Sequence, residues 1–147
     1  MNRDLYKKVI FDLILEYKIK VKRWRSSNSG WAYLENWEVE IPKPVSLAKF
    51  ITCAHEIGHL VKDKPSHTLW KSEYIATKYA FDLCNQHNIV IPEKEIRNNL
   101  NYLICCIADD IRLNNVEYKS IDKHVFLKLR LNSKMSTQAL MLLHIGF

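Results

Sequence analysis

The segment His55-Glu56-Ile57-Gly58-His59 holds the residues of this chain whose types and spacing best suit chemistry. Residues four apart lie on one face of a helix, so both imidazoles can reach a single metal ion. Glu56 projects from the same end of that surface, where its carboxylate can take a proton from a water molecule on the metal. The pattern therefore predicts a zinc site with His55 and His59 as ligands and Glu56 as the catalytic base.

The residues before the motif favour a helix that carries it. Leu47, Phe50, Ile51 and Ala54 recur at helical spacing, which indicates an amphipathic helix buried on one side. Ser46 is a suitable N-cap for this helix. Gly58 lies between the two histidines, where the missing side chain allows a close approach by backbone or substrate.

A catalytic zinc ion needs a third protein ligand and an open position for water, and Glu73 is the best candidate for that ligand. It opens a second helical run over residues 71–83. Thr77 lies one turn later on the same face, where its hydroxyl can accept the second N–H of a ligating histidine. The sequence also allows an ordinary first-turn glutamate at position 73.

Two rival ligands follow the motif. Asp63 lies one turn after His59, but in a charged, turn-like stretch where we expect a solvated side chain. His67 follows Pro65 in a predicted loop, where most single histidines are exposed. A third histidine at the metzincin spacing is absent, because Pro65 stands there.

Together these segments resemble the ImmA/IrrE family of zinc peptidase domains. Residues 50–59 are similar to the family's lead into the metal motif, and residues 73–80 to its Glu-x-Glu-Ala-(Asn/Asp)-x-Phe-Ala helix. Residues 89–92 look like its Leu-Met-Pro signature, and residues 135–140 resemble its C-terminal helix more faintly. The chain departs from the pattern at Ile75, where the family has a second glutamate, and at Thr77, where it has Asn or Asp.

The resemblance implies an α+β fold of the minimal zincin-like type. Its parts are an N-terminal helix, a small three-stranded antiparallel sheet, the HExxH helix, the glutamate helix and C-terminal helices. We expect a single domain over residues 1–147, with the metal-site core at about 45–96 and a helical part at about 97–147. Hydrophobic periodicity predicts helices over residues 4–17, 47–59 and 71–83, after Pro92, and over 121–131 and 136–143. Strands are predicted over residues 19–24, 31–34 and 37–41.

The resemblance also implies an activity: zinc-dependent endopeptidase cleavage of a regulatory protein. Typical substrates are helix-turn-helix repressors or antitoxin-like partners in phage or mobile-element circuits. Tyr74, Tyr79 and His67 are candidates for an additional oxyanion donor. The alternative is a binding module, in which a zincin fold docks a protein or nucleic acid without hydrolysing it.

Composition fits one cytoplasmic domain with no membrane partner. The chain has 147 residues, no apolar run of transmembrane length, and a charged N-terminal segment unlike a signal peptide. Cys53, Cys84, Cys105 and Cys106 lack metal-ligand spacing, and we expect buried free thiols.

The net charge of +6 and the basic run over residues 18–25, beside Trp24, suggest two uses for that segment. A nucleic acid can place its phosphates on the cations and a base on the indole. A charged edge strand that resists aggregation is the explanation we favour.

Overall fold

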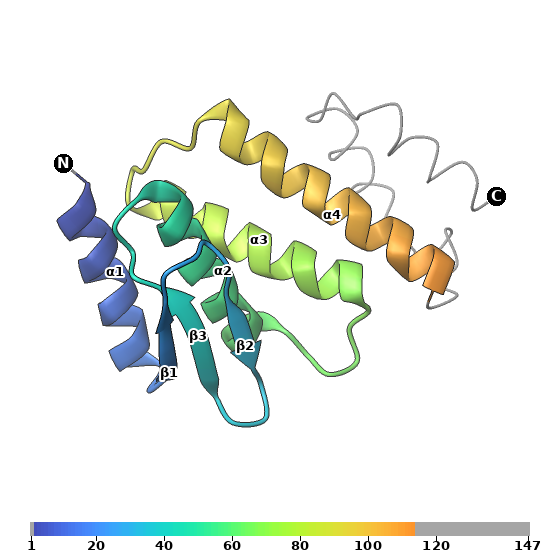
Figure 1. The fold of residues 1–147 in the computed structure, drawn as a ribbon, viewed down its shortest axis with the longest axis horizontal. Helices are drawn as coiled ribbons and strands as arrows, with labels where there is room; N and C mark the ends of the chain where they lie inside the picture. Colours follow the sequence, from blue (N-terminus) through green and yellow to red (C-terminus); the bar gives the residue numbers. More distant parts are fainter. Residues whose placement is uncertain (1, 114–147) are drawn as a thin grey trace. The chain divides into compact units, whose positions relative to one another are not determined.

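The computed structural model describes residues 2–113, and Figure 1 labels its helices and strands. These residues form two compact units, one made of residues 2–66 and 74–91, the other of residues 67–73 and 92–113. The predicted helices at 121–131 and 136–143, and the faint resemblance at 135–140, lie outside the described residues. The single domain over residues 1–147 stays a prediction.

The first unit contains three strands and most of the helices, so the predicted α+β class is confirmed. Helix α1 spans Arg3–Glu16, and strands β1, β2 and β3 span Lys20–Arg25, Trp31–Tyr33 and Glu38–Pro42. Helix α2 spans Leu47–Lys62 and α3 spans Leu69–Gln86, of which the part from Tyr74 onward belongs to this unit. Helix α4, Glu93–Leu113, belongs to the second unit.

The sheet is mixed, so the predicted antiparallel arrangement is wrong. The strand order is β1-β3-β2, in which β2 pairs antiparallel with β3 but β1 pairs parallel with it. The segment between β1 and β2 crosses to the far side of β3 instead of making a tight hairpin. The first turns of α2 hold this crossing segment, because Thr52 Oγ1 donates to the Asn28 carbonyl at 3.1 Å and Lys49 Nζ to the Ser26 carbonyl at 3.2 Å.

The core lies between one face of the sheet and the helices. Val39 and Ile41 of β3 are fully buried, and α2 packs against this strand with Phe50 and Ile57. Alternation along β3 turns Glu38 and Glu40 to the opposite face of the sheet. Helix α1 packs against α2, where the Tyr6 ring lies 5.0 Å from the Phe50 ring.

Capping interactions define the start of α2 and the end of α3. Ser46 Oγ accepts from the Lys49 backbone N–H at 3.4 Å, which confirms the predicted N-cap of α2. Helix α3 ends in a Schellman motif, with Asn88 at φ 53° and the Ile89 N–H donating to the Cys84 carbonyl at 2.8 Å. Ile89 is thereby turned into the core.

Candidate metal centre

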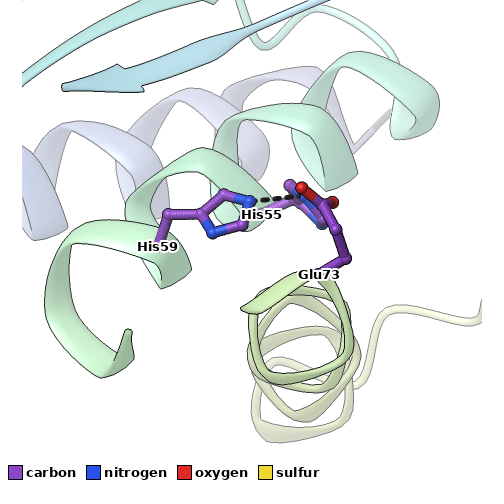
Figure 2. Close-up of side chains that lie close together, drawn as sticks. All are labelled: His55, His59 and Glu73. Carbon is purple, nitrogen blue, oxygen red and sulfur yellow. Dashed lines mark hydrogen bonds between the residues drawn. The ribbon is translucent and has the colours of Figure 1, made fainter. Parts of the chain in front are cut away.

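Helix α2 presents both histidines of the motif toward one point. The Nε2 atoms of His55 and His59 lie 3.0 Å apart, and the rings meet edge to face at 83° with centroids 4.7 Å apart (Figure 2). His59 is buried and His55 is half-buried. The i, i+4 spacing thus has the consequence expected from the sequence, two imidazole nitrogens aimed at the same place.

Glu73 of α3 supplies a carboxylate to the same place. One ligand atom from each of His55, His59 and Glu73 lies within 4.8 Å of the other two, and Figure 2 shows the Glu73 side chain directed at the two rings. Among the described residues, this is the group of His, Cys, Asp and Glu side chains that can hold a metal ion. The structure therefore brings together the three residues that the sequence predicted as ligands.

The close approach of α2 and α3 depends on Gly58. A Cβ at this position would lie 3.1 Å from both the Cα and the carbonyl oxygen of Ala76, and 3.1 Å from the Tyr79 Cβ. Ala76 is itself fully buried. Two small residues thus let the helix backbones meet beside the histidines, which agrees with the close approach that the sequence suggested for Gly58.

The donor set fits zinc. Two nitrogen ligands at the usual zinc distance in a tetrahedral site lie about 3.3 Å apart. The observed separation of 3.0 Å is close to that value, so a small rotation of either ring would accommodate the ion. Two imidazoles and one carboxylate are a known catalytic zinc set, and they leave one position for water.

Each histidine has a polar neighbour at its other ring nitrogen. Thr77 Oγ1 lies 3.3 Å from His55 Nδ1, the contact predicted from its place one turn after Glu73. Asp63 Oδ2 lies 3.5 Å from His59 Nδ1. Such partners hold the ring orientation of a histidine that ligates a metal.

The expectation of a solvated Asp63 is therefore wrong. Its side chain is only 8% exposed and lies beside His59, because Asp63 ends α2 one turn after that histidine. Its spacing from His59 was the signal available in the sequence. Neither Asp63 nor His67 belongs to the metal-binding group.

Glu56 lies against the start of β2. A Cβ built on Gly30 would come within 2.5 Å of the Glu56 Cγ and 2.9 Å of its Oε1. The crossing segment that α2 holds through Thr52 thus brings Gly30 onto the Glu56 side chain. Nothing in the sequence pattern indicated this contact, which joins residues 26 positions apart.

Tyr79, a predicted candidate for the oxyanion donor, and Cys53, a predicted buried thiol, both have partners away from the two histidines. The Tyr79 hydroxyl interacts with Tyr17, and burial, followed by the charges of Tyr17 and Glu16, raises its pKa. The residues that affect the Tyr79 hydroxyl lie at the C-terminal end of α1 and not at the metal centre. This location does not favour Tyr79 as an oxyanion donor. Cys53 Sγ donates to the Pro42 carbonyl at 3.0 Å, and burial raises its pKa to about 12.

The cysteines are free, as predicted, but one of them is not buried. Cys53, Cys84 and Cys106 are buried, whereas Cys105 is exposed. Neighbouring positions on a helix are about 100° apart. The buried face of α4 holds Leu103, Ile104, Cys106 and Ile107, and Cys105 lies outside it, which corrects the expectation of four buried thiols.

No family model, curated protein or solved structure matches this chain. Within residues 2–113, every helix is too short or too polar to cross a membrane.

Proposed function

We propose that this chain is a zinc-dependent endopeptidase that cleaves a regulatory protein partner. The observation that carries the proposal is the convergence of His55, His59 and Glu73 within 4.8 Å. This set leaves one coordination position, and its two histidines lie in the same helix as Glu56. A zinc ion bound there would polarise the scissile carbonyl and lower the pKa of a water molecule to about 7.

Glu56 is the proton carrier of this proposal. Its carboxylate takes the proton of the attacking water and later delivers it to the leaving amine. Gly30, lying against the Glu56 side chain, limits where the carboxylate can sit. Thr77 and Asp63 hold the two imidazoles from behind, so that the ligand nitrogens keep their direction.

A substrate has a strand to pair with. Strand β2 is at one edge of the sheet, and Gly30 at its start touches Glu56. An extended peptide added to this edge would make main-chain hydrogen bonds with little dependence on its sequence. Its backbone would then pass beside the proposed base.

The identity of the substrate rests on the resemblance to the ImmA/IrrE family alone. We propose a helix-turn-helix repressor or an antitoxin-like protein, in a phage or mobile-element circuit. A cytoplasmic location fits four free cysteines.

The test compares the wild type with Glu56→Gln. Each protein is purified with zinc, its metal content is measured by mass spectrometry, and a proteome-derived peptide library is searched for new N-termini. We expect about one zinc per chain in both proteins and new N-termini with the wild type only. Equal cleavage by Glu56→Gln would refute the role of Glu56.

The second candidate function is a non-catalytic zincin-fold binding module. Ile75 favours it, because the resembled family has a carboxylate there. Stoichiometric zinc with no new N-termini from the wild type would support the module over the peptidase.

A further inference from the structure

The face of the sheet turned away from the core carries a cluster of cations. Paired residues on neighbouring strands project to the same side. Arg23 and Trp31 both pair with Glu40, while Lys20 and Tyr33 both pair with Glu38. We use the name outer face for the residues on this side of the sheet: Lys20, Lys22, Arg23, Arg25, Trp31, Tyr33, Glu38 and Glu40.

The carboxylates of the outer face lie beneath its cations. The Glu40 carboxylate forms ion pairs with Arg23 at 2.5 Å, Arg25 at 3.1 Å and Lys22 at 4.0 Å. Lys20 Nζ forms an ion pair with the Glu38 carboxylate at 2.6 Å. The Glu38 and Glu40 side chains are 13% and 7% exposed, against 72% for Lys20, 50% for Lys22 and 64% for Arg23.

The outer face therefore presents positive charge to solvent. The Arg23 hydrogen bond is the main reason that the pKa of Glu40 lies below its usual value, so this carboxylate is ionised at neutral pH. Four cations and two carboxylates leave a net charge of +2 on the outer face. The negative members are covered, so an anionic ligand meets the cations first.

One aromatic ring of the outer face is exposed to solvent. Trp31 is 60% exposed and lies in the same row as Arg23 and Glu40. Trp24 is the indole that lies beside the basic run in the sequence. It pairs with Ile41 on the inner face, and its ring centroid lies 5.6 Å from that of Phe11. The second aromatic of the outer face, Tyr33, is already covered by Lys22 Nζ, 4.4 Å from its ring centre.

We propose that the outer face binds single-stranded nucleic acid, with phosphates on Lys20, Lys22 and Arg23 and an unpaired base stacked on Trp31. Exposed cations beside an open aromatic ring on a sheet are the two elements of such platforms. An acidic peptide would use the cations but not the indole. A duplex keeps its bases stacked, so it would also leave Trp31 unused. The inference is independent of the metal centre, because none of these residues belongs to it.

The experiment measures binding of the full chain to a fluorescent 12-nucleotide oligo(dT) by anisotropy, between 50 and 200 mM salt. Loss of one stacked base costs about tenfold in affinity, so we expect Trp31→Ala to weaken binding about tenfold and Trp31→Phe much less. Lys22→Gln should lower the slope of log K against log salt by about 0.7, the value for one phosphate contact on a single strand. Lys8→Gln, an exposed lysine of α1, is the matched control and should leave the affinity close to that of the wild type.

Three results would overturn the proposal. The first is no binding by the wild type at 50 mM salt. The second is equal affinity of Trp31→Ala and Trp31→Phe while circular dichroism shows both folded. The third is a poly-glutamate peptide or a duplex that competes as well as the oligonucleotide, which would assign the outer face to another class of partner.

Discussion

Replacing Gly30 by alanine displaces the proposed base without touching a proposed ligand. None of the described glycines has a positive φ, so alanine can adopt the backbone at position 30. The new Cβ would lie 2.5 Å from Glu56 Cγ, 2.9 Å from Oε1 and 3.0 Å from Cδ. Ordinary carbon contacts are about 3.5–4.0 Å, so the Glu56 side chain must move by about 1 Å.

The size of the effect follows from that displacement. A misplacement of about 1 Å of a catalytic group costs on the order of 100-fold in rate. At about 1.4 kcal/mol per tenfold, this corresponds to about 2.8 kcal/mol of barrier. Zinc affinity should stay unchanged, because the atoms that the new Cβ approaches most closely all belong to Glu56.

The assay is kcat/KM for a peptide recovered from the N-terminus search, together with zinc affinity by competition with a chromophoric chelator. Gly30→Ala added to Glu56→Gln should cause no further loss, since the displaced group is already inactive. Full activity of Gly30→Ala with intact zinc binding would refute the argument that the carboxylate must lie where Gly30 leaves room for it. A loss of zinc would instead assign Gly30 to positioning of the ligands.

Further substitutions test the packing, the histidine partner and the outer face separately. Gly58→Ala should lower the free energy of unfolding by up to about 2 kcal/mol, since overpacking outweighs the helical preference of alanine; a more stable variant in urea denaturation would contradict the close helix contact. Asp63→Asn should weaken zinc binding about 10- to 100-fold in the chelator assay, whereas the exposed Asp82→Asn should not. The pKa of Glu40 is lowered from 4.5, chiefly by Arg23, so its ionised form stabilises the fold above pH 4.5, and this contribution disappears as the pH falls through the lowered value. Glu40→Gln should therefore be less stable than the wild type at pH 7, with a difference that shrinks toward pH 3 in thermal unfolding; a constant difference would show that the charge is not responsible.

Local signals predicted the helices, and they predicted that His55, His59 and Glu73 lie close together. The capping residue Ser46 and the helical spacing in residues 47–59 are short-range features, and α2 spans Leu47–Lys62 as a result. Glu73 and Thr77 were found for the same reason, because one helical turn places both on the face toward the histidines.

The pairing of the strands was not predictable in the same way. The family resemblance implied an antiparallel sheet, yet β1 lies parallel to β3. The crossing segment that this pairing requires contacts α2 through Lys49 and Thr52, and no periodicity in residues 19–41 encodes those contacts. The same long-range contact decides where Gly30 lies, and therefore its approach to Glu56.

Substitutions at the contact between Gly58 and Ala76 would change the width of the candidate metal site while every predicted ligand is kept. Gly58 lies between the histidines in α2, and Ala76 lies between Glu73 and Thr77 in α3. One added methyl group at this contact would push the two rows of donor atoms apart, and a wider cage suits a larger cation. The volume of two small side chains, neither of them a donor, would thus influence the size of an ion bound by His55, His59 and Glu73.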